Sequence, residues 1–145
     1  MLLGNLGNRL NDSDKIAQAI ELYKQALIIA RETGDRHSES ITLNNLGEAY
    51  IKINDARYAI VHIEKALDIT REIGYRRGEG NALRNMSLAL SKLGDYVHAI
   101  KYGETAIEIY EQLKYSASTI KMRQHLAEWQ GLKSQSNLGK NINNA

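Results

Sequence analysis

The chain has 145 residues, of which 43% are apolar, and a formal net charge of +2, so it has enough apolar content for one folded core. It contains no cysteine, which excludes disulfides, thiolate metal sites and a cysteine nucleophile. Basic and acidic residues are interspersed and no apolar run approaches the roughly 20 residues of a membrane span. We therefore expect a cytoplasmic protein that binds neither nucleic acid nor membranes.

Helix-forming residues dominate the sequence and proline is absent, which predicts an all-α fold. Shifted by forty residues, the chain aligns with itself. LGNLGNRL at residues 3–10 aligns with LNNLGEAY at 43–50 and LRNMSLAL at 83–90. Three longer segments that begin at Ala19, Ala59 and Ala99 align in the same way. The shared positions are apolar or small and lie three and four apart, which indicates buried helical faces.

Each repeat, at about residues 1–35, 36–75 and 76–115, divides into two helices. In the second repeat we expect one helix from about Arg36 to Ile53 and another that ends near Ile73. Gly34 and Gly74 are placed to close helices in the left-handed conformation. Asp12, Asp55 and Asp95 fall at or near the starts of the second helices, where aspartate caps free backbone N–H groups.

Residues 116–133 can form one further helix, with Ile120, Leu126 and Trp129 on one face, that caps the array. Residues 134–145 are polar and predict a frayed tail. At the other end the chain starts inside a helix without a preceding turn. We therefore expect a fragment of a larger protein, with possible homo-oligomers through the uncapped first helix.

The repeated residues resemble the tetratricopeptide repeat (TPR), which places a large residue, Leu-Gly and Tyr on its first helix and Ala, an aromatic residue and Ala on its second. The second repeat matches with Leu43, Leu46, Gly47, Tyr50, Ala59, Ile63 and Ala66, and the first with Leu3, Leu6, Gly7, Leu10, Ala19, Tyr23 and Ala26. The forty-residue period is longer than the usual 34. It resembles the repeats of kinesin light chains, of polarity regulators that bind G-protein regulatory peptides, and of bacterial signalling proteins.

This resemblance covers about residues 1 to 115 and implies an α-solenoid, a right-handed superhelix of about three stacked helix pairs. The first helices of such pairs line a concave groove that binds a protein or peptide. Family members use an asparagine before Leu-Gly to hold peptide main chain. Asn5, Asn45 and Asn85 align at that position and would form a ladder of amides, because an amide both donates and accepts hydrogen bonds.

An alternative for these asparagines is that each one bonds to a neighbouring helix and only stiffens the array. His125 occupies the equivalent position in the capping helix and would end the ladder. The alignment adds other groove positions: Asn8, Arg9, Asn44, Glu48, Lys52, Asn81, Arg84, Leu88 and Lys92. The basic residues among them could attract acidic side chains or a terminal carboxylate, or they could only solubilise the rim. Leu88 suggests an apolar contact with an amphipathic helix.

Catalytic and metal-binding patterns are missing. The four histidines, His37, His62, His98 and His125, do not have metal-ligand spacing, and no glycine cluster follows a strand. The sequence therefore predicts no enzyme, no metal site and no cofactor. It predicts a protein-interaction module within a larger signalling or scaffold protein; the alternative is a structural spacer or self-association module without a peptide ligand.

Overall fold

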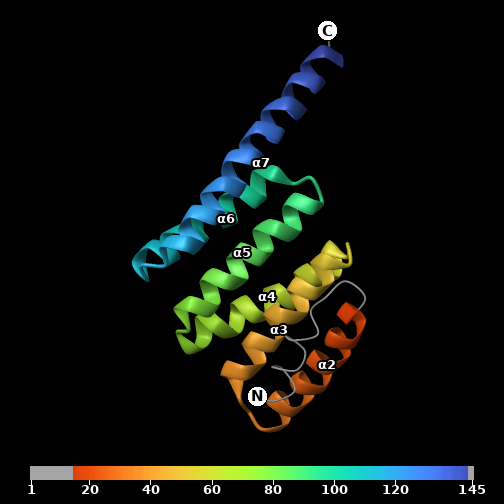
Figure 1. Ribbon diagram of the computed structural model, residues 1–145, viewed down its shortest axis with the longest axis vertical. Helices are drawn as coiled ribbons and strands as arrows, with labels where there is room; N and C mark the ends of the chain where they lie inside the picture. Colours follow the sequence, from red (N-terminus) through yellow and green to blue (C-terminus); the bar gives the residue numbers. More distant parts are fainter. Residues whose placement is uncertain (1–14, 144–145) are drawn as a thin grey trace.

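The computed structural model describes residues 15–143, and this part of the chain is built from helices joined by short turns, with no β-strand. Figure 1 shows the helices in order: α2 (Ile16–Glu32), α3 (Arg36–Lys52), α4 (Ala56–Ile73), α5 (Arg76–Lys92), α6 (Tyr96–Gln112) and α7 (Ser116–Asn143). The predicted boundaries of the second repeat agree with α3 and α4 within one residue.

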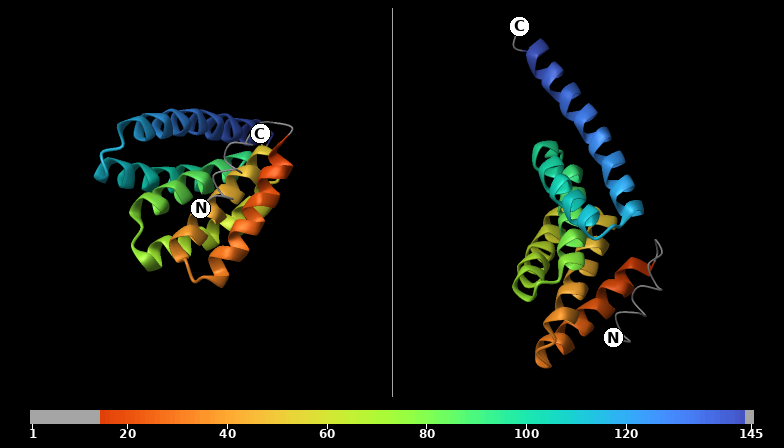
Figure 2. Two further views of the ribbon diagram at one scale, coloured as in Figure 1. Left: turned by 60° about the horizontal axis from the view of Figure 1, so that its bottom comes forward. Right: turned by 90° about the vertical axis from the view of Figure 1, so that its left-hand side faces the viewer.

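The helices form stacked antiparallel pairs. Within a repeat α3 packs on α4 and α5 on α6, and between repeats α2 packs on α3, α4 on α5 and α6 on α7. The first helices α3 and α5 also contact each other directly. Figures 1 and 2 show the pairs following one another along the molecule in place of a compact bundle. The prediction of an all-α repeat solenoid is confirmed.

The turns follow a period of twenty residues. The backbone is left-handed at Gly34, Asn54, Gly74, Gly94 and Lys114, with φ between 61° and 77°. After each one the next residue donates its N–H to a carbonyl five positions back, as in Asp35 to Ala30 at 2.9 Å and Tyr115 to Tyr110 at 2.8 Å. This bond closes a helix in the Schellman arrangement. The predicted roles of Gly34 and Gly74 are confirmed.

Aspartates cap the helices that follow three of these turns. Asp55 and Asp95 accept hydrogen bonds from the backbone N–H groups of Tyr58 and His98, as the sequence predicted. Asp35 does the same for Ser38 at the start of α3. The prediction for Asp12 lies outside the described residues.

Glycines allow close helix contacts at two positions. A Cβ on Gly47 would lie 2.4 Å from Ile63 Cγ1, so only glycine lets α3 approach α4 this closely. Gly103 stands where the family has an aromatic residue, and a Cβ there would lie 2.7 Å from Leu126 Cδ2. Leu126 of α7 therefore occupies the space that the missing aromatic ring leaves.

Two largely buried carboxylates, Glu39 and Glu79, join successive repeats. Glu39 lies 3.4 Å from Arg31 of the preceding helix and 3.0 Å from Arg36 on its own helix. Forty residues later Glu79 lies 3.7 Å from Arg71 and 3.2 Å from Arg76. Both glutamates lie in the first turn of their helices, where the helix dipole stabilises a negative charge.

The last helix differs from the sequence prediction in two ways. Helix α7 continues to Asn143, ten residues beyond the predicted end of the cap, so residues 134–143 are helical and not a frayed tail. The physical reason is that the chain has no proline and that no described residue after Lys114 adopts the left-handed conformation that ends the earlier helices. Figure 1 shows this part of α7 extending past the other helices.

The buried face of α7 is also not the predicted one throughout. Leu126 and Trp129 are buried as expected, but Ile120 is 56% exposed and Met122 fills the core in its place. The positions of α7 that correspond to Gly47 and Tyr50 are Ala127 and Gln130, and both are exposed. This polar outer face suits the end of a repeat array.

Candidate peptide-binding groove

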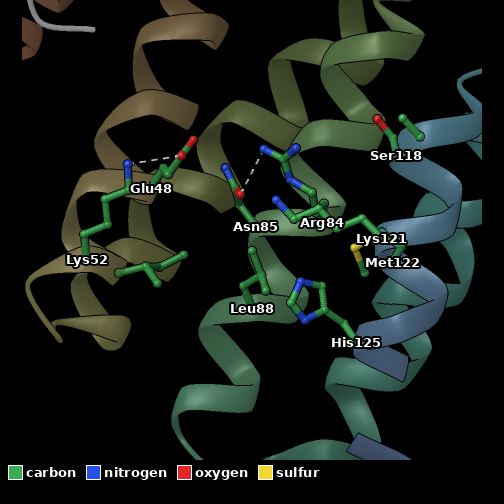
Figure 3. A pocket seen from close by; sticks show the side chains of 11 residues that line it. Glu48, Lys52, Arg84, Asn85, Leu88, Ser118, Lys121, Met122 and His125 are labelled. Atoms are coloured by element: carbon green, nitrogen blue, oxygen red, sulfur yellow. Dashed lines mark hydrogen bonds and ion pairs between the residues drawn. The ribbon is translucent and has the colours of Figure 1, made fainter. Parts of the chain in front are cut away.

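The first helices of two successive repeats, α3 and α5, and the capping helix α7 line a set of adjoining hollows. The largest has a volume of about 530 Å³ and lies between α3, α5 and α7. Its lining includes five of the predicted groove residues, namely Glu48, Lys52, Arg84, Asn85 and Leu88. Figure 3 shows these side chains projecting from their helices toward the cavity, with Lys121, Met122 and His125 entering from α7.

The polar wall of this cavity has excess positive charge. Lys52 lies 3.5 Å from Glu48 one turn earlier on α3 and is paired with it. Arg84 and Lys121 have no carboxylate partner within the described residues, so three cations share one carboxylate. The Nε of Arg84 is buried without a hydrogen-bond acceptor, an arrangement that favours an added anionic group because a buried unpaired donor is costly.

The floor of the cavity is apolar. Leu88 is partly buried beside the main core, Met122 is fully buried, and Ile51 lines the wall from α3. An apolar floor with a few polar groups around it is typical of sites that bind a side chain and fix its orientation.

Asn85 does not point freely into the groove. Its side chain is 0% exposed, and its Nδ2 donates to Asn44 Oδ1 at 3.0 Å, while its own Oδ1 accepts a longer bond of 3.4 Å from Arg84. The alternative that an asparagine joins two helices therefore describes Asn85 in this structure.

Asn45 has a different environment from Asn85. It is partly exposed and lines a second hollow of about 320 Å³ together with Asn44 and Asn81. No hydrogen bond from its amide reaches another described residue, so Asn45 can offer both its donor and its acceptor to a ligand. The carbonyl of Asn81 accepts a bond from the Tyr110 hydroxyl at 2.9 Å and holds that side chain in place.

Of the remaining predicted residues, only Lys92 belongs to the part of the chain that the structure describes. Lys92 lines a third hollow of about 260 Å³ with Leu88 and His125, next to Trp129. The ring of His125 stacks on Trp129 at 5.4 Å with an interplanar angle of 17°. His125 therefore lines the groove beside Leu88, at the position that aligns with Asn85. Asn5, Asn8 and Arg9 lie outside the described residues.

The sequence alignment missed the contribution of the capping helix. Ser118, Lys121 and Met122 line the main cavity although the prediction assigned α7 only a capping role and a histidine. The forty-residue shift would have found Lys121, which aligns with the predicted groove residue Asn81, but not Ser118 and Met122, which align with Gly78 and Ala82.

Buried tyrosines support this surface from behind. Burial raises the pKa of Tyr110, and the nearby Arg84 and Arg77 act in the opposite direction without cancelling the effect. Burial likewise raises the pKa of Tyr23, with a smaller contribution from Glu48. Both hydroxyls are therefore protonated at neutral pH and can donate hydrogen bonds.

Comparison with known proteins identifies the family of these repeats. A sequence model of the tetratricopeptide repeat matches residues 1–72 and again residues 55–112. The chain belongs to the tetratricopeptide repeat family. Repeats of this family in general mediate protein–protein interactions and are non-catalytic scaffolds. A comparison with curated proteins finds no match.

Solved structures show the same TPR fold. Two crystal structures of nearly identical TPR-like repeats from Podosopora anserina, named for kinesin light chain, superpose with TM-scores of 0.79 and 0.78. Their sequences are 17% and 18% identical to this chain, and each covers 92% of it. The chain spans 66% of the length of each. The predicted likeness to the extended repeats of kinesin light chains is therefore confirmed for the fold.

Two further observations concern residues 15–143 only. Within them no three His, Asp or Glu side chains are grouped as metal ligands would be. None of the described helices has the length and apolar character needed to cross a membrane.

Proposed function

We propose that this TPR array binds an extended or helical peptide of a partner protein in the groove between α3, α5 and α7. The observation that carries the proposal is the main cavity, where Arg84 and Lys121 have no carboxylate partner and Leu88 and Met122 supply an apolar floor. A ligand that places an acidic side chain beside an apolar one would satisfy both parts of this surface.

Asn45 is the residue best placed to hold peptide main chain. It is partly exposed and its amide is not engaged by other described residues, unlike the amide of Asn85. Of the two described asparagines of the predicted ladder, only Asn45 would hold the peptide. Asn85 would instead support the Arg84 side chain. The role of Asn5 stays a prediction. That the chain is part of a cytoplasmic signalling or scaffold protein also stays a prediction.

A peptide library displayed on phage tests this function. We expect selected peptides to be enriched in acidic residues, and to bind variants Lys121→Glu and Asn45→Ala at least about tenfold more weakly than the wild type. Lys65→Glu on the exposed face of α4 is the matched control for Lys121→Glu, because it makes the same charge change outside the groove. Equal losses from the two charge variants would show that general electrostatics, and not the groove, carries the binding.

The alternative is a spacer or self-association module. Its support is the Asn85–Asn44 bond, which uses a groove amide to stiffen the array. Sedimentation over a concentration series separates it from peptide binding, since self-association requires a mass that rises with concentration. If no library peptide binds and the mass rises, the peptide-binding proposal is wrong.

A further inference from the structure

A separate cavity of about 470 Å³ lies where the start of α7 meets α5. Its lining contains three cations, Arg77, Arg84 and Lys114, and no carboxylate. None of the three forms an ion pair with another described residue. The cavity adjoins the peptide groove, because Arg84 and Ser118 line both.

One of these cations, Arg77, is held in place by a contact that leaves its donors available. The Arg77 guanidinium lies over the Tyr115 ring, 5.8 Å from its centre, which fixes the group without using its N–H donors. The buried Nε of Arg84 has no acceptor. Such a donor costs free energy unless an acceptor reaches it, so an anion that reached it would remove this cost.

The equivalent helix starts carry their own negative charges, and α7 does not. Helix α3 has the Asp35 carboxylate on the Ser38 N–H at 3.1 Å and the buried Glu39 in its first turn. At the same positions α7 has Tyr115 and Thr119, its first turn contains no acidic residue, and no described side chain caps the Ser118 N–H. The first N–H groups of a helix lack intrahelical partners and attract anions.

We propose that this cavity binds a phosphoryl group. Three cations, free backbone N–H groups and the hydroxyls of Ser116 and Ser118 match a dianion with three acceptor oxygens better than they match a single carboxylate. Figure 3 shows Arg84 extending from α5 on the side of the groove where Ser118, in the first turn of α7, lies. The group would be a phosphorylated serine or threonine of a peptide in the groove; this last step rests on the proposed function, whereas the anion site itself does not.

Inorganic phosphate added to the full chain, at constant ionic strength and about pH 7.5, is the first probe. We expect saturable NMR shifts of the Ser116 and Ser118 amides and of the Arg84 Nε–H, with acetate producing much smaller ones. The double variant Arg77→Gln with Lys114→Asn should weaken phosphate binding at least about tenfold. Asparagine is chosen at position 114 because it tolerates the left-handed backbone there.

Two further variants make the result decisive. Arg57→Gln with Lys65→Gln removes the same charge from the exposed face of α4 and should leave phosphate binding unchanged. Ser118→Asp places a carboxylate at the start of α7 and should abolish phosphate binding while raising the melting temperature, because it compensates the helix dipole. Shifts that stay linear with phosphate, or equal losses in the two double variants, would overturn the site.

Phosphoserine with acetyl and N-methylamide caps separates the two sources of the phosphoryl group. If the capped phosphoserine binds more tightly than inorganic phosphate, a phosphoryl group carried by a peptide is supported. If the two bind equally, the assignment of the phosphoryl group to a peptide is overturned. Library peptides that bind the groove while phosphate does not bind the cavity would overturn this inference alone and leave the proposed function standing.

Discussion

The Asn85 side-chain amide donates a hydrogen bond to Asn44 Oδ1 at 3.0 Å and is fully buried, so it ties α5 to α3 inside the joint between two repeats. Sequence alignment placed Asn45 and Asn85 at equivalent positions, yet the Asn85 amide is buried and bonded to Asn44, whereas Asn45 is partly exposed and its amide is not engaged by other described residues. We therefore expect Asn45 to contribute to peptide binding and Asn85 to stability.

Asn85→Ala should therefore lower the free energy of unfolding by about 1–3 kcal/mol, because it removes a buried hydrogen bond and leaves Asn44 unpaired. Asn45→Ala, the matched control, should change it by less than about 0.5 kcal/mol. Urea denaturation measures both. In a double-mutant cycle Asn44→Ala and Asn85→Ala should be non-additive, since the two residues share one bond; strict additivity would mean that the bond contributes nothing.

Lys114 is the turn residue with the least suitable side chain. Its φ of 61° lies in the left-handed region, which costs a residue with a Cβ about 1–2 kcal/mol. We expect Lys114→Gly to raise the free energy of unfolding by up to about 1 kcal/mol, measured by urea denaturation. Lys133→Gly, the same change inside the exposed part of α7, should lower it by roughly 0.5–1 kcal/mol. A lower stability of the Lys114 variant would contradict the strain argument.

Two glycines inside helices should respond in opposite directions to alanine. Gly47→Ala places a Cβ 2.4 Å from Ile63 Cγ1 and should destabilise the array by about 1–3 kcal/mol, since α3 and α4 must separate. Gly139 has no neighbour within 4 Å, so Gly139→Ala should increase the helicity of the end of α7. Circular dichroism during thermal unfolding measures both changes. A tolerated Gly47→Ala would show that the two helices can shift at little cost.

Asp95 should titrate below its ordinary value of 3.8. Its pKa is lowered first by the hydrogen bond with the His98 ring and then by the bond from the His98 backbone N–H. Because the folded pKa lies below the unfolded one, the stabilising contribution is complete above pH 3.8 and is lost as the pH falls through the folded pKa. NMR titration of the carboxyl carbon gives the midpoint.

His98→Ala removes the ring and should move the Asp95 midpoint back toward 3.8, while the backbone bond to the carboxylate remains. Asp95 is exposed at the surface, so the accompanying change in stability should be small. An unchanged midpoint in this variant would show that the ring does not act on the carboxylate.

The repeat, the helices and most of the turns could be predicted from the sequence. These features depend on contacts between residues close in the chain: left-handed glycines at Gly34 and Gly74, aspartate caps at Asp55 and Asp95, and apolar residues three and four apart. The sequence analysis ended the last helix at residue 133, whereas α7 continues to Asn143.

Only the tertiary structure decided which groove residues are available to a ligand. Asn85 is buried because Asn44, forty-one residues earlier, accepts its hydrogen bond, and Ile120 is exposed because Met122 packs in the core instead. Lys121 and Ser118 join Arg84 only because α7 packs beside the third repeat. Such neighbours are chosen by how helices stack across repeats, and a pattern within one helix carries no information about the side chains that reach it from the next.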